Sequence, residues 1–116
     1  MYSERQINQA AVALLEMWQQ RSRCDGLPET CRPGSRIDGY AVQQAMGELQ
    51  LHALFGWKIA ATSVEGQRHI AVNGPLAGRL YTDRVLRNGA QVNLHNNLIG
   101  CRDRVCISFR AHTPTA

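Results

Sequence analysis

Residues 55–61 read FGWKIAA, and this stretch decides the fold class. Its members Phe55, Trp57, Ile59 and Ala61 alternate with smaller or polar residues. An apolar alternation of period two predicts a β-strand. The chain before this stretch has a helical pattern, and the chain after it holds short β-prone runs. The sequence therefore predicts an α+β fold in which helices precede strands.

The chain before the strand predicts two antiparallel helices. Residues 3–22 carry apolar side chains at helical spacing, and Ser3 is a suitable N-cap. This apolar stripe comprises Ile7, Ala10, Ala11, Leu14, Leu15 and Trp18. A loop rich in proline and glycine follows at residues 24–35, and Ser35 then starts a second helix over residues 37–52. The inward positions of that helix are expected to be Ile37, Tyr40 or Ala41, Ala45 and Leu49.

The chain after the strand predicts short elements. Residues 63–71 predict a helical turn, and the Gly74-Pro75 pair then breaks the pattern. Further β-prone runs lie at residues 78–81, 90–95 and 105–109. The expected layout is thus a helix pair followed by short strands.

The composition limits the classes of protein that the chain can represent. With 116 residues and 44% hydrophobic residues, it can form one domain with one core. No apolar run approaches the ~20 residues that span a bilayer, and no export signal opens the sequence. We therefore expect a cytoplasmic protein without a membrane partner. The net charge of +4 comes from dispersed arginines without a basic helix or stacking motif, so nucleic-acid binding is not expected.

The cysteines do not indicate a metal site. They are Cys24, Cys31, Cys101 and Cys106. Without an export signal, free thiols are expected in place of disulfides or structural zinc.

Lys58 interrupts the otherwise apolar strand and is the first candidate for chemistry. Neighbouring side chains of a strand point to opposite faces, so Lys58 lies opposite Trp57 and Ile59. If that face meets solvent, Lys58 is an ordinary surface lysine. If that face lines a cleft, Lys58 is placed for proton transfer or enolate stabilisation. The residues alone leave both interpretations open.

Three blocks of the sequence carry a resemblance to a known enzyme family. Residues 56–63, GWKIAATS, are similar to a Gly-Trp-Lys-Ile-Gly-x-Thr-Ser stretch, with Ala60 where that family usually has glycine. Residues 37–43, IDGYAVQ, resemble an Asp-Ala-Tyr-x-Ile-Gln helix start. Residues 72–80, VNGPLAGRL, resemble a Val-x-x-Pro-x-x-Gly-x-Leu stretch. These motifs belong to the 2-keto-4-pentenoate hydratase family of the fumarylacetoacetate hydrolase superfamily, and the resemblance covers residues 1–99.

The resemblance implies metal-dependent hydration of 2-hydroxy-2,4-dienoates, a step in the catabolism of aromatic compounds. In that family Mg²⁺ or Mn²⁺ chelates the carboxylate and the 2-oxygen of the substrate and stabilises the enolate, and water adds at the far end of the conjugated system. The resemblance also implies that Lys58 lies in the active site. The related 4-oxalocrotonate decarboxylases share these motifs, so residues 1–99 do not separate hydration from decarboxylation.

Three weaker candidates follow Lys58 in the sequence. Asp83 lies where the family often places polar active-site residues, although its residue type in this stretch favours a turn residue. Thr62 and Ser63 could bind a substrate carboxylate, or they could cap the helical turn that follows them.

Residues 100–116 form a tail that departs from the family pattern. The family has roughly Met-Arg-x-Ala-Glu-x-Glu-x-Ala-Phe here, and its paired glutamates hold the metal. In this chain residues 100–110 read GCRDRVCISFR, and no glutamate follows Glu65. We therefore expect no metal ligands and no cofactor in this chain, in contrast to the Mg²⁺ or Mn²⁺ of the intact family.

A change of reading frame would explain the tail. One permitted set of codons for residues 100–110, read one base further on, encodes Ala-Ala-Glu-Thr-Glu-Phe-Ala-Phe, which restores the paired glutamates. We hypothesise that the frame changes near Leu98 to Gly100.

Two functions are consistent with these observations. The leading hypothesis is a truncated hydratase-family member that is inactive alone, with exposed strands that favour homo-oligomers or other association. The alternative is a non-catalytic module that binds a full-length hydratase at its oligomer interface through the helix at residues 3–22.

Overall fold

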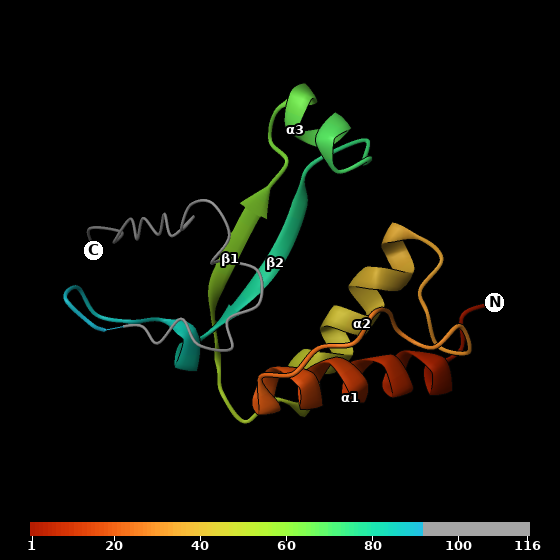
Figure 1. Cartoon of the computed structure of the whole chain (residues 1–116), viewed down its shortest axis with the longest axis horizontal. Coiled ribbons are helices and arrows are strands. Elements are labelled where there is room, and N and C mark those ends of the chain that lie inside the picture. The colour runs from red at the N-terminus through yellow and green to blue at the C-terminus, as the bar shows by residue number, and fades with distance from the viewer. Residues whose placement is uncertain (92–116) are drawn as a thin grey trace.

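The computed structural model describes residues 1–91, and its elements follow the predicted order of helices before strands. Figure 1 shows a helix pair from which a long β-hairpin rises, with a short helix at the far end of the hairpin. The elements are α1 (Glu4–Gln20), α2 (Arg36–Leu49), β1 (Leu54–Ala60), α3 (Val64–His69), β2 (Leu76–Tyr81) and the 3₁₀ turn η1 (Thr82–Arg84). The α+β class is confirmed.

Local hydrogen bonds set the ends of α1. The Ser3 hydroxyl accepts from the Gln6 amide at 3.2 Å, and the Gln6 side-chain oxygen accepts from the Ser3 amide at 2.9 Å. This reciprocal pair satisfies N–H groups that have no partner within the helix. The helix ends at Arg21, whose left-handed backbone has a φ of 53° and whose N–H returns to Met17 and Trp18. The predicted start of α1 at Ser3 is therefore confirmed.

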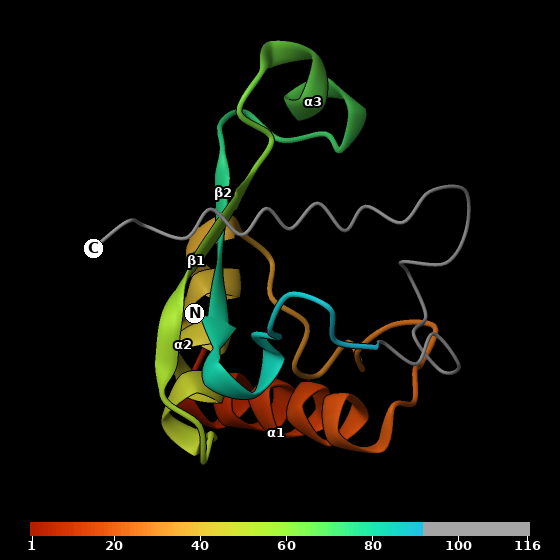
Figure 2. The ribbon, with the colours of Figure 1, turned by 90° about the vertical axis from the view of Figure 1, so that its left-hand side faces the viewer.

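The two helices are not antiparallel, which corrects the prediction. The loop over residues 21–35 runs back along α1, so the Tyr2 hydroxyl donates to Cys31 O at 2.6 Å and the Gln6 side-chain NH₂ donates to Thr30 O at 2.9 Å. α2 therefore begins beside the start of α1, and the two helices cross obliquely in Figures 1 and 2. A tight connection would force neighbouring helices to run in opposite directions, but this loop is long enough to return the chain to its starting end.

The core lies between the two helices and consists of small side chains. Its buried members are Ala10, Ala11, Cys31, Val42 and Ala45. Larger side chains pack around this centre while remaining partly exposed, namely Tyr2, Ile7, Leu14, Leu27 and Met46. The apolar stripe predicted for α1 thus faces the core, except at Trp18, which is 39% exposed.

α2 buries a different face from the one predicted. Val42 and Ala45 are buried, whereas Ile37 is 80% exposed and Leu49 is 46% exposed. The apolar residues of α2 form more than one candidate stripe. The stripe that contains Val42 is the one that packs against the small residues of α1. The predicted inward positions Ile37 and Leu49 are wrong, and Ala45 is confirmed.

The hairpin is an antiparallel pair in which Trp57 lies opposite Arg79 and Lys58 lies opposite Gly78. Figure 2 shows it rising edge-on from the helices, with α3 in the connection between its strands. The strand at residues 78–81 and the helical turn at residues 63–71 are confirmed. Ala90 and Gln91 are not in a strand. The rest of the run at residues 90–95, the run at residues 105–109, Cys101, Cys106 and the tail from residue 100 lie outside the described residues.

Candidate functional site

Lys58 lies in the middle of β1, on the strand face opposite Trp57 and Ile59, and its side chain is exposed. Its ammonium group donates to the carbonyl oxygen of Ile59 at 2.9 Å. Nearly every side chain of β1 is exposed, so within residues 1–91 no layer of chain covers either face of the strand over its whole length. The described residues therefore place Lys58 at an open strand edge.

The chain turns sharply directly after β1. Ala61 adopts a left-handed backbone with a φ of 57°. Residues other than glycine, asparagine and aspartate rarely adopt this conformation, because the Cβ crowds the following carbonyl. The side-chain amide of Gln67 donates to Ala61 O at 3.1 Å and holds this turn. Nothing in the alanine itself predicts the conformation, so the sequence carried no signal for it.

Ser63 caps α3. Its hydroxyl accepts from the Gly66 amide at 3.0 Å, and both Thr62 and Ser63 are exposed. Ser63 therefore has the capping role that the sequence suggested. The cap uses the Ser63 hydroxyl oxygen as an acceptor, whereas a substrate carboxylate would accept from the hydroxyl proton. A hydroxyl can still donate its own proton while it accepts from the backbone.

Asp83 lies at the other end of the hairpin from Thr62 and Ser63. It belongs to η1, where its carboxylate is 3.5 Å from Arg84 Nε and 3.8 Å from His52 Nε2. The Arg84 guanidinium in turn lies 4.8 Å from the ring centre of Trp18. The structure thus brings Thr62 and Ser63 together, places Lys58 between the two ends, and does not bring Asp83 to the others.

Tyr40 and Gln43 join α2 to β2 through the strand's backbone. The Ala77 N–H donates to the Tyr40 hydroxyl at 3.0 Å, and the Gln43 side-chain NH₂ donates to Ala77 O at 3.1 Å. The Arg79 N–H donates to the Gln43 side-chain oxygen at 2.9 Å. A spacing of three residues puts Tyr40 and Gln43 on one face of the helix. These two residues match the tyrosine and glutamine of the helix-start motif, and their role here is to dock the hairpin.

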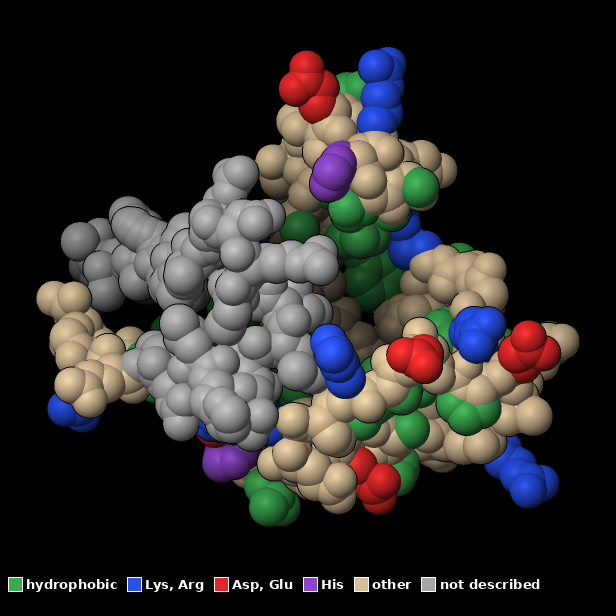
Figure 3. All heavy atoms as spheres, in the orientation of Figure 1, with side chains coloured by type: hydrophobic (Ala, Val, Ile, Leu, Met, Phe, Trp, Pro, Cys, Tyr) green, Lys and Arg blue, Asp and Glu red, His purple; other side chains and the backbone are tan. Residues whose placement is uncertain are grey.

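A cleft of about 920 Å³ opens between the start of α2 and the chain that leads into β2. Figure 3 shows a hollow in this region, between the α3 end of the hairpin and the helices. The cleft is lined by Arg36, Gly39, Tyr40, Gln43, Ala71, Val72, Asn73, Leu76 and Ala77. These residues could not be grouped from the sequence, because segments about 30 residues apart meet here only in the fold.

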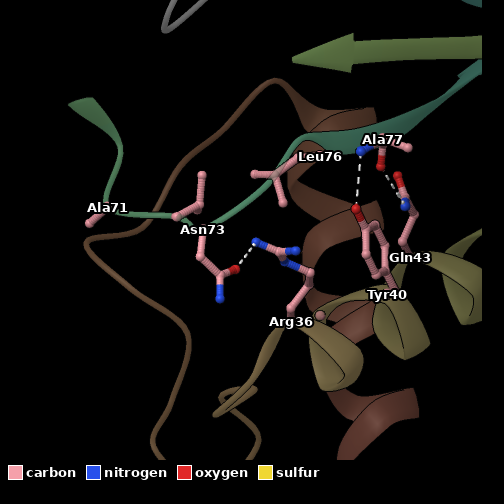
Figure 4. Close-up of a pocket in the computed structure, with 9 residues that line it drawn as sticks. Arg36, Tyr40, Gln43, Ala71, Asn73, Leu76 and Ala77 are labelled. Atoms are coloured by element: carbon pink, nitrogen blue, oxygen red, sulfur yellow. Dashed lines mark hydrogen bonds between the residues drawn. The ribbon is translucent and has the colours of Figure 1, made fainter. Parts of the chain in front are cut away.

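Arg36 is the charged residue of this cleft. Its guanidinium donates to the Asn73 side-chain oxygen at 2.7 Å, across the mouth of the cleft in Figure 4. Figure 4 also shows the Tyr40 and Gln43 side chains reaching toward Ala77. Most polar groups of the cleft are therefore engaged with one another, and they serve to hold the hairpin against α2.

The described residues do not offer a metal site. Within residues 1–91, no three His, Cys, Asp or Glu side chains gather closely enough to hold a metal ion. Over the same residues, no helix is both long enough and apolar enough to cross a membrane. Among the described residues, Cys24 is an exposed free thiol and Cys31 is a buried one.

The chain was compared with protein-family models, curated proteins and solved structures, and none of them matches it.

Proposed function

We propose that this chain carries the N-terminal helices and the Lys58 hairpin of a 2-keto-4-pentenoate hydratase-type protein, and that it does not catalyse hydration by itself. The family would add water to 2-hydroxy-2,4-dienoates in the cytoplasm. The observation that carries the proposal is the open hairpin: Lys58 stands on a strand whose faces are both exposed. An active site needs further chain around such a lysine to exclude water and position the substrate.

The residues near Lys58 do not fit the divalent cation that the resemblance implies. Mg²⁺ and Mn²⁺ prefer carboxylate oxygens, and within residues 1–91 no group of metal-binding side chains is present. No step of a reaction can therefore be derived through a metal on this part of the chain.

Two experiments test the proposal. In the first, the purified chain is mixed with 2-hydroxypenta-2,4-dienoate and Mg²⁺ or Mn²⁺, and loss of the dienoate absorbance is followed. We expect no loss above the rate without protein. Turnover that requires Mg²⁺ and disappears in Lys58→Ala would show that the chain is a complete enzyme.

In the second, one base is deleted at the Gly100 codon of the gene and the protein from the new frame is assayed. We expect Mg²⁺-dependent hydration that Lys58→Ala abolishes. A gene that encodes no paired glutamates in that frame would refute the frame change. Assays with a 2-hydroxydienoate and with 4-oxalocrotonate would separate a hydratase from a decarboxylase.

A non-catalytic module that binds a full-length hydratase is the second candidate. The exposed side chains Phe55, Trp57 and Ile59 favour it, because they leave apolar surface for a partner. The apolar stripe of α1 packs against α2, so the hairpin is a better contact surface than α1. Co-purification of the chain with a full-length hydratase would support this candidate, and failure to co-purify would reject it.

A further inference from the structure

The outer edge of β2 is closed by α2. Ala77 N–H, Ala77 O and Arg79 N–H all point away from β1, and each is bonded to Tyr40 or Gln43. Backbone groups on a strand edge normally pair with another strand or with water. Since side chains of α2 already occupy these groups, the sheet cannot add a strand beside β2.

Among residues 1–91, no further strand pairs with the outer edge of β1. In an antiparallel ladder, residues whose backbone groups face the partner alternate with residues whose groups face away. Ala77 and Arg79 face away from β1, so their opposite residues Ile59 and Trp57 face away from β2. The Ile59 carbonyl is bonded there to the Lys58 ammonium at 2.9 Å, which is a side-chain contact that an incoming strand can replace.

The side chains along this open edge are apolar. Phe55 is 60% exposed, Trp57 is 49% exposed and Ile59 is 48% exposed. Trp57 and Ile59 share one face of the strand, and Lys58 lies on the other. A hairpin of two strands is marginally stable in water unless it gains another strand or a covering layer.

We propose that β1 pairs antiparallel with β1 of a second copy of this chain, with Trp57 of each copy opposite Trp57 of the other. In this register Phe55 lies opposite Ile59 twice, so all three apolar side chains meet apolar side chains. On the other face, Lys58 lies opposite Gly56, so the two ammonium groups do not meet. The sequence of β1 is therefore complementary to itself.

Neighbouring registers are less favourable. Only a shift of one β1 strand along the other by an even number of residues keeps their outward backbone N–H and C=O groups facing one another. A shift in one direction puts Lys58 opposite Lys58, and like charges directly opposite each other are destabilising. A shift in the other direction leaves Ile59 without a partner among the three apolar residues. The chain bulges at Phe55, so the new ladder ends there.

The size of this contact predicts a reversible dimer. Phe and Trp side chains bury about 150–250 Å² each when fully covered, so Phe55 and Trp57 each offer on the order of 100 Å². With Ile59 the strand contributes roughly 300 Å² per copy, below the ~800 Å² per partner of a standard stable interface. The proposal thus predicts association that depends on protein concentration.

Sedimentation equilibrium of the full chain from micromolar to millimolar concentration tests the proposal. The chain is expected to shift from monomer to dimer, and Ile59→Glu is expected to weaken the dimer at least about tenfold. Leu51→Glu is the matched control, because Leu51 is 93% exposed but lies outside β1. A chain that is monomeric throughout, or a dimer that Ile59→Glu leaves unchanged, overturns the proposal.

The double variant Phe55→Lys with Ile59→Glu tests the register. In the proposed register each new ammonium faces a new carboxylate, so the double variant should recover much of the affinity that Ile59→Glu loses. If it stays as weak as Ile59→Glu, the register is wrong. Circular dichroism confirms that the helices are retained, and Trp57→Glu provides a second variant on the same edge. The result is independent of the proposed hydratase function, which these experiments do not measure.

Discussion

Gly47 lies where α2 comes closest to β2. A Cβ at this position would be 2.9 Å from Arg79 Nη1 and 2.9 Å from the Tyr81 hydroxyl. The arginine end can move, but Tyr81 is 3% exposed and its ring stacks edge-on against Trp18. The Tyr81 hydroxyl therefore has little room to yield.

We predict that Gly47→Ala destabilises the fold. Alanine favours a helix over glycine by about 1 kcal/mol, but the displaced Tyr81 should cost more, with a net loss of about 1–2 kcal/mol. Urea unfolding followed by circular dichroism measures the change. Gly39→Ala is the control, because no atom lies within 4 Å of a Cβ there, and it should stabilise α2. Equal stabilisation by both substitutions would contradict the close approach.

Tyr2 couples the start of α1 to the returning loop. Burial raises the pKa of its hydroxyl above the ordinary value of 10.0, and the charges of Cys31 and Asp38 raise it further. A raised pKa in the folded protein means that the neutral hydroxyl stabilises the fold below pH 10.0 and that this stabilisation is lost as the pH rises through the folded pKa.

Tyr2→Phe tests this coupling. It removes the hydrogen bond to Cys31 O, which should cost about 0.5–1.5 kcal/mol at neutral pH. Above pH 10.0 the Tm of the unsubstituted chain should fall toward that of Tyr2→Phe. Thermal unfolding of both proteins from neutral to alkaline pH measures the gap. A Tm gap that stays constant across this range would contradict the role of Tyr2.

At the scale of elements, Gln43 makes two of the hydrogen bonds that dock the hairpin on α2. Gln43 accepts from Arg79 N–H at 2.9 Å and donates to Ala77 O at 3.1 Å. We predict that Gln43→Ala costs about 1–3 kcal/mol, because it leaves two partly buried backbone groups without partners. Urea unfolding of this variant measures the loss.

Gln44→Ala is the matched control for Gln43→Ala. Gln44 is the next residue along α2 and is exposed, so its substitution should change stability by less than about 0.5 kcal/mol. Similar effects of the two substitutions would show that Gln43 does not dock the hairpin.

The elements also show which predictions local sequence can support. Ser3, Ser35 and Ser63 each accept a backbone N–H at the start of a helix, at 3.2, 3.1 and 3.0 Å. Such contacts join residues a few positions apart, so capping residues could be recognised from the sequence. The buried face of α2 could not, because it depends on the partner helix. The prediction that Ile37 lies in the core was therefore wrong, and Val42 is the buried residue.

For the whole molecule, the distribution of apolar side chains is uneven. The helix pair buries small residues such as Ala10, Ala11 and Ala45, whereas the larger Phe55, Trp57 and Ile59 stay exposed on the hairpin. Burial of apolar area is the main favourable term in folding, at roughly 25 cal/mol per Å². The hairpin therefore has free energy to gain from another strand, which is the physical basis of the proposed dimer.

The sequence by itself determined the local elements: the alternation at residues 55–61 made a strand, and the serine caps started the helices. These features follow from the conformational preferences and hydrogen bonds of neighbouring residues. Only the tertiary structure decided the oblique crossing of α1 and α2, the docking roles of Tyr40 and Gln43, and the edge of β1 that stays unpaired among residues 1–91. Burial and docking depend on segments far apart in the chain, and their meeting is set by how the returning loop at residues 21–35 packs.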